Sequence, residues 1–163
     1  MHIVINTKYL TYGDYKVKCA VGKRGINIKK KEGDQITPKG NYIIEKIFYR
    51  KDRVGIIKTS ISKSIIKKNM GWCDDPSSNE YNKQIKLPFK YSSEKLYRKD
   101  NIYDIFLVLN FNRRPIKKGK GSAIFIHIAK NKMLPTKGCI AIKKKDLKKL
   151  IGLIKKRTTV KII

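Results

Sequence analysis

His127 and Cys139 are the two residues whose types and spacing could do chemistry together. A free thiol has a pKa of about 8.5, so it needs a nearby base to become a reactive thiolate. An imidazole within hydrogen-bond reach supplies that base and forms a thiolate–imidazolium pair. Gly138 lets a substrate approach the backbone closely, and the Gly138 and Cys139 amides can donate to an oxyanion. The pattern therefore predicts acyl transfer through a cysteine nucleophile.

The histidine lies in the apolar segment 123–128, which its composition predicts to be a strand. Side chains alternate between the two faces of a strand, so Ala123, Phe125 and His127 should share one face. A lone histidine on such a strand is also typical of a structural core residue whose ring nitrogens are hydrogen-bonded, with no catalytic role. The chain between His127 and Cys139 is long enough to loop back, so we expect the two residues on adjacent strands.

The remaining segments predict a single, mainly β domain over residues 1–163 with one late helix. Periodicity and turn residues predict a hairpin from residues 2–10 and 15–21, strands at 42–49, 102–111 and 158–163, and an amphipathic helix at 146–156. Thr37-Pro38-Lys39-Gly40 fits a type I turn. Residues 50–101 show little periodicity but contain Trp, Tyr and Leu, which favours a folded insertion that shapes a cleft.

The charge balance is strongly basic, with 40 Lys plus Arg against 12 acids and a formal net charge of +28. Such a field attracts anionic polymers or surfaces, including nucleic acid, anionic lipid and acidic cell-wall material. A general lysine bias, with solvated side chains over the whole surface, accounts for the same numbers. No apolar run reaches the roughly 18 residues of a membrane span, and the N-terminus shows no secretory signal.

Three cysteines, Cys19, Cys73 and Cys139, leave at least one thiol free. They form no CxxC pair, which argues against a structural zinc site. We expect Cys19 to be a small buried hydrophobe. Cys73 is the rival nucleophile, but Asp74 and Asp75 follow it, and neighbouring carboxylates raise the pKa of a thiol.

The stretch containing His127, Thr136, Gly138 and Cys139 resembles the signature of L,D-transpeptidase (YkuD-like) catalytic domains. That signature is a strand ending in His, a loop, then Ser or Thr, one residue, Gly and Cys. The helix and final strand over 146–163 agree with it, and Thr37-Pro38 with Gly40 is similar to the family's early TP.G turn. Further blocks resemble a compact branch without a signal peptide: 71–76, 81–82 and 121–125. The resemblance covers essentially the whole chain.

This resemblance implies a β-sandwich with one C-terminal amphipathic helix and a peptidoglycan cross-linking activity in bacterial cell-wall biogenesis and cell shape. Cys139 would attack a stem-peptide carbonyl, and a neighbouring stem's amine would capture the thioester. His127 would move the protons, with a backbone carbonyl orienting its ring. No metal or organic cofactor is implied, and carbapenem β-lactams are implied covalent inhibitors. The cell envelope or periplasm is the implied location, while the absence of a signal leaves the cytoplasm open.

Several residues are candidates for binding the substrate. Arg98 could hold a carboxylate bidentately, and Trp72 could wall the cleft or fill the core. Asp74 could bind a substrate ammonium or cap a turn, and Asn112 could donate to a peptide backbone or cap a loop. Thr136 belongs to the signature itself.

The sequence departs from the family pattern at Lys137, where many members have His or Arg, and at Ala141, where many have Arg or Asn. The loop between His127 and Cys139 is also shorter than in much of the family. These departures predict an altered substrate preference and leave open whether 1–3 or 3–3 stem links form. Two other functions stay open: an L,D-carboxypeptidase, in which water is the acceptor, and a basic nucleic-acid-binding module. No recognition motif for a specific nucleic acid accompanies the charge.

Overall fold

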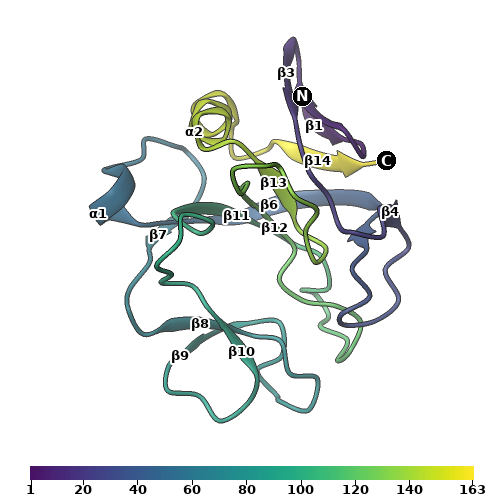
Figure 1. Cartoon of the computed structure of the whole chain (residues 1–163), viewed down its shortest axis with the longest axis vertical. Helices are drawn as coiled ribbons and strands as arrows, with labels where there is room; N and C mark the ends of the chain where they lie inside the picture. The colour runs from purple at the N-terminus through teal and green to yellow at the C-terminus, as the bar shows by residue number, and fades with distance from the viewer.

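The computed structural model describes residues 1–163, which fold around one nine-stranded sheet (Figure 1). In spatial order its strands are β13 (Ile140–Ile142), β12 (Phe125–Ile128), β11 (Ile105–Leu109), β6 (Gly40–Tyr49), β14 (Thr159–Ile162), β1 (His2–Ile5), β2 (Tyr9–Tyr12) and β3 (Tyr15–Lys18). The ninth strand, β7 (Lys63–Ile65), pairs with β6 off this path.

Two small sheets and two helices complete the fold. The first small sheet has the order β10 (Ser93–Lys95), β8 (Met70–Cys73), β9 (Gln84–Lys86), and the second pairs β4 (Ile26–Asn27) with β5 (Thr37–Pro38). The helices are α1 (Lys51–Val54) and α2 (Lys144–Leu153). Figure 1 places the β8–β10 sheet at the opposite end of the molecule from α2. No helix is long and apolar enough to span a membrane.

The large sheet curls until its two ends nearly meet. The residue pair Ala20 and Ala141 exchanges two backbone hydrogen bonds of 2.9 Å, which link the chain after β3 to β13. The sheet therefore forms a nearly closed barrel, an arrangement that leaves few backbone groups on exposed edges. The prediction of a mainly β fold is confirmed, with the short α1 as a second helix.

Strict alternation along β11 and β12 gives the sheet two different apolar faces. One face carries Ile124, Ile126 and Ile128 and packs with α2 into a core of 24 buried residues. The other carries Phe125 and Phe106 and packs with Trp72 of the insertion into a second cluster of 8 buried residues. Burial of such aromatic side chains stabilises the fold strongly, so the β8–β10 sheet is held firmly against the face that bears His127.

The predicted turn at Thr37-Pro38-Lys39-Gly40 is wrong. Thr37 and Pro38 form β5, and the Thr37 and Lys39 amides donate to Gly25 and Asn27 of the neighbouring segment. Thr37 is completely buried, and its hydroxyl accepts from the Gly22 amide and donates to the Gly138 carbonyl, both at 2.8 Å. These long-range bonds outweigh the local Pro–Gly signal.

The other predicted elements match the structure apart from their boundaries. The first strand of the predicted hairpin is two strands, β1 and β2, because the chain turns at Asn6, whose side chain accepts from the Lys8 and Tyr9 amides. The irregular segment 50–101 is a folded insertion, as expected, and contains α1, β7 and the β8–β10 sheet.

Candidate active site

Cys139 and His127 lie on adjacent strands, as the sequence predicted. β12 and β13 are parallel, with Ile126 opposite Ile140 and His127 opposite Ala141. Cys139 therefore precedes β13 at the position opposite Phe125, and the Phe125 amide donates to its sulfur at 3.4 Å. Because residues two apart share a face, Cys139 and His127 are diagonal neighbours on the face covered by the insertion.

The thiol of Cys139 is held in its protonated form. Its Sγ–H donates to the Ala123 carbonyl at 3.0 Å, and the residue remains partly exposed. Desolvation, followed by the charge of Glu94, raises the pKa of Cys139 to about 12. Burial therefore disfavours the expected resting thiolate–imidazolium pair.

The His127 ring is neutral and has a defined orientation. Its Nδ1 lies 3.0 Å from the Ile128 carbonyl oxygen, which can only accept, so Nδ1 carries the proton and Nε2 is the free base. Burial lowers the pKa of His127 to about 4. The Tyr103 ring packs edge-on against the imidazole, with centroids 5.6 Å apart. The orienting backbone carbonyl that the sequence could not name is that of Ile128.

One backbone amide beside the sulfur is available for an oxyanion. The Gly138 amide donates to Thr136 Oγ1 at 3.0 Å, and the Thr136 hydroxyl donates to the Cys139 carbonyl at 2.6 Å. The Cys139 amide has no acceptor within the chain. The expected pair of oxyanion donors is therefore reduced to the Cys139 amide, and the Thr136 hydroxyl bridges two backbone groups of the loop that leads to Cys139.

Gly138 is required by its backbone conformation and by space. Its φ of +139° lies in the region that favours glycine, and an added Cβ would lie 3.0 Å from the Ile36 carbonyl oxygen. The carbonyl of Gly138 is held by Thr37, so the loop before Cys139 is fixed on both sides.

The predicted substrate-binding residues have partners of their own. Trp72 is 2% exposed, packs against Phe125 and donates from Nε1 to Asn82 at 3.1 Å, so it fills the core and does not wall a cleft. Asn112 caps its loop by donating to the Lys117 and Gly121 carbonyls. Asp74 accepts from the Ser92 hydroxyl at 2.7 Å, a bond that joins the chain after β8 to the chain before β10 and does not cap a local turn.

Arg98 binds a carboxylate bidentately, as predicted, but the carboxylate belongs to the protein itself. Its guanidinium forms a bidentate pair with Asp100 at 2.8 and 2.6 Å and remains one-third exposed. The same group lies over the Tyr103 ring, 5.5 Å from its centroid, and its charge helps to keep the pKa of the buried His127 low. A substrate carboxylate at Arg98 would compete with Asp100.

Cys73 and Cys19 are both buried. Cys73 is completely inaccessible, which leaves Cys139 as the one partly exposed thiol. Burial raises the pKa of Cys19 to about 12, consistent with its predicted role as a small apolar residue.

Asn82 is a site residue that sequence reasoning did not single out. Its Oδ1 accepts from Trp72 Nε1 and from the Ala123 amide at 3.0 Å, while its Nδ2 donates to the Phe111 and Asn112 carbonyls. It is 1% exposed and has a φ of +58°, a conformation that Asn tolerates better than most residues. Asn82 thereby joins the insertion to the residue whose carbonyl binds the thiol. The Tyr81-Asn82 pair in the sequence was the available signal.

Glu94 and Tyr103 were also missed, because neither stands in a recognisable motif. The Tyr103 hydroxyl donates to Glu94 Oε1 at 2.5 Å, and Tyr103 packs against both His127 and Phe125. Desolvation raises the pKa of Glu94 and raises that of Tyr103 well above its usual range. Glu94 is also one of the causes that raise the pKa of Cys139.

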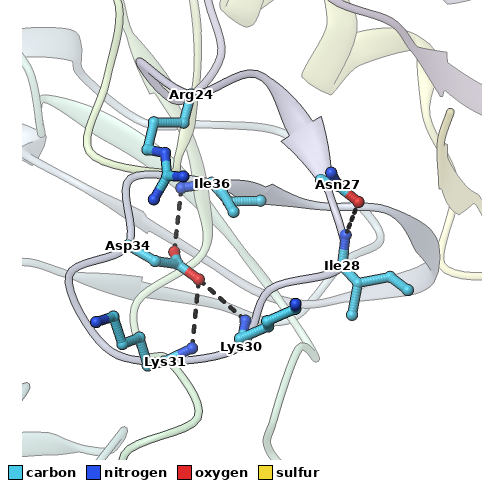
Figure 2. Close-up of a pocket in the computed structure, with 7 residues that line it drawn as sticks. All are labelled: Arg24, Asn27, Ile28, Lys30, Lys31, Asp34 and Ile36. Carbon is cyan, nitrogen blue, oxygen red and sulfur yellow. Dashed lines mark hydrogen bonds between the residues drawn. The ribbon is translucent and has the colours of Figure 1, made fainter.

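A pocket of about 320 Å³ lies over the segment 24–36 and includes neither His127 nor Cys139 (Figure 2). Figure 2 shows the Asp34 carboxylate accepting from the Lys30, Lys31 and Ile36 amides. Arg24, Lys30 and Lys31 line this pocket, which therefore has a basic rim.

The low pKa of His127 makes the protein less stable in acid. Well above pH 6.5 the ring is neutral in both states, and as the pH falls through 6.5 towards 4 only the unfolded chain gains the proton. We expect about 3 kcal/mol of unfolding free energy to be lost across this window and no further loss from His127 below it. Urea denaturation at several pH values should show that His127→Gln removes this part of the pH dependence.

The mainly β fold thus places a partly exposed thiol after a glycine and an imidazole on the next strand, an arrangement of the kind that cysteine acyl transfer uses. A family model described as the YkuD L,D-transpeptidase catalytic domain matches residues 1–162. The chain therefore belongs to the YkuD family of L,D-transpeptidase catalytic domains.

One solved structure with a similar fold is that of Bd1075 from Bdellovibrio bacteriovorus. The identity is 15%, the TM-score is 0.50, and the match covers 99% of this chain and 47% of that one. The chain thus spans about half the length of that structure, and the likeness concerns the fold alone. No curated protein matches the sequence.

Proposed function

We propose that this chain is a peptidoglycan L,D-transpeptidase in which Cys139 is the nucleophile and His127 the general base. The observation that carries the proposal is the placement of a partly exposed thiol and a neutral, oriented imidazole on the same face of neighbouring strands. Family membership supports the class of reaction. The net charge of +28 would favour association with an anionic wall polymer, which fits work in the cell envelope.

The first half of the reaction forms a thioester. Nε2 of His127 takes the proton from Cys139 Sγ as the sulfur attacks the carbonyl carbon of a stem peptide, and the Cys139 amide donates to the developing oxyanion. The carbon–nitrogen bond then breaks, and the imidazolium gives its proton to the leaving amine. Because burial disfavours both the thiolate and the imidazolium, the charged pair exists only while the substrate is reacting.

The second half returns the enzyme to its starting state. An amine from a neighbouring stem attacks the thioester, His127 accepts a proton from that amine, and the carbon–sulfur bond breaks. The sulfur regains its proton from the imidazolium and again donates to the Ala123 carbonyl. Water in place of the amine would make the same site an L,D-carboxypeptidase.

Carbapenem acylation tests the nucleophile directly. We expect incubation with a carbapenem to add the mass of one ring-opened drug, because the sulfur attacks the strained lactam carbonyl as it would a peptide. Peptide mapping by mass spectrometry should locate the adduct on Cys139 and nowhere else. An unmodified protein, or an adduct on Cys73, would count against the assignment.

Product analysis separates transfer from hydrolysis. Purified sacculi are treated with the protein, digested to muropeptides and examined by mass spectrometry. New cross-linked dimers support transpeptidation and reveal whether stem positions 1 and 3 or 3 and 3 are joined. Shortened monomers without dimers would instead identify a carboxypeptidase.

A further inference from the structure

Lys29 is buried, in contrast to the many exposed lysines of this chain. Its side chain is 3% exposed, and its Nζ donates to Asp34 Oδ1 at 2.5 Å and to the Ile36 carbonyl at 3.3 Å. Burying an ammonium group costs free energy unless it is paired and hydrogen-bonded. The Lys29 ammonium is nevertheless withdrawn from water and paired with Asp34.

The Lys29 side chain runs past two glycines that flank the candidate active site. A Cβ on Gly121 would lie 2.4 Å from Lys29 Cε, and a Cβ on Gly138 would lie 3.6 Å from Lys29 Nζ. Gly121 leads to Ala123, whose carbonyl accepts from the thiol, and Gly138 immediately precedes Cys139. Lys29 therefore packs against Gly121 and has its ammonium beside Gly138, along the two backbone segments that hold the sulfur.

Lys29 and Asp34 place opposite charges beside the loop that holds the thiol. The Lys29 ammonium favours the thiolate form of Cys139. Burial would raise the pKa of Asp34, but Lys29 and three backbone amides outweigh it and lower that pKa to about 2. Asp34 thus stays anionic at neutral pH, while the ammonium lies nearer the glycine beside the sulfur.

We propose that Lys29 is a positioning residue that fixes the Gly138–Cys139 loop against the Gly121–Ala123 segment and places a positive charge where negative charge develops during the attack. The Ile36 carbonyl keeps the ammonium in that place, and the charge of Asp34 offsets part of its field. This inference rests on the proposed role of Cys139 as the nucleophile.

The test is the rate at which iodoacetamide alkylates Cys139 near neutral pH in Lys29→Met and Asp34→Asn variants. We expect Lys29→Met to slow alkylation about 3- to 10-fold because the pKa of the thiol rises, and Asp34→Asn to accelerate it because an opposing charge is lost. Lys29→Arg, which keeps the charge, should restore most of the rate. Peptide mapping assigns the modification to Cys139.

A merely structural ion pair predicts a different pattern. Both substitutions break the same bond, so both would then change the rate in the same direction, and that result would overturn the proposal. If Lys29→Met does not fold, Asp34→Asn alone serves as the test. An unchanged or slower alkylation rate in that variant would also overturn the proposal. The alkylation rates could change in opposite directions in a protein that forms no cross-links. That result would support the role of Lys29 and reject the proposed function, so a failure of one proposal can be told from a failure of the other.

Discussion

Cys139→Ala will abolish cross-linking, with a loss of at least about 10⁴-fold in turnover, because no other accessible nucleophile can form the thioester. The fold should survive, since the substitution removes one partly exposed side chain and two hydrogen bonds of its sulfur, to the Ala123 carbonyl and from the Phe125 amide. We expect the free energy of unfolding to change by about 1 kcal/mol. Muropeptide analysis measures the activity, and urea denaturation measures the stability.

His127→Ala should have an effect of the same order, because both residues act in one step and their losses do not add. The double variant should therefore be no less active than either single variant. Cys73→Ala and His2→Ala are matched controls, since Cys73 is inaccessible and His2 lies on the exposed start of β1. Cross-linking by Cys139→Ala at the wild-type rate would refute the assignment of the nucleophile.

Asn82→Ala should produce the largest loss of stability among the substitutions considered, about 3–5 kcal/mol. The change removes four hydrogen bonds at a site that is 1% exposed, and it leaves the Trp72 indole and the Ala123 amide without their acceptor. We expect a melting temperature about 10 °C lower. The cross-linking activity per folded molecule should also fall, because the Ala123 carbonyl accepts the hydrogen bond of the thiol.

Asn79→Ala is the control for this prediction. Asn79 lies in the same segment but is exposed, with its side chain accepting from Lys118. Its replacement should change the melting temperature by no more than about 2 °C. A small effect at Asn82 as well would show that the insertion is not anchored to the site through this side chain.

The alternating apolar strands were predictable because burial dictates them. Ile124, Ile126 and Ile128 face one core and Phe125 the other, and the same rule placed His127 on the side of the insertion. The adjacency of β12 and β13 followed from the length of the connecting loop. Local pattern and tertiary packing agree in these elements, so the sequence alone predicts the strands and the faces on which their side chains lie.

Other features depend on contacts between distant segments and could not be predicted. Thr37 leaves the expected turn because Gly22 and Gly138 bind its hydroxyl. Lys29 stands in a lysine-rich run, and only the fold distinguishes it from its exposed neighbours. The protonated state of Cys139 and the neutral His127 result from burial, and the motif itself suggested the opposite charge states.

The acyl-enzyme itself is the most direct test of the proposed chemistry. Wild-type protein is mixed with a purified tetrapeptide muropeptide, quenched in acid within the first turnovers, digested and mapped by mass spectrometry. We predict a thioester on the peptide that contains Cys139, absent in Cys139→Ala and released when an amine acceptor is added before the quench. Cross-linking that proceeds with no such adduct, or with the adduct on another residue, would contradict the account.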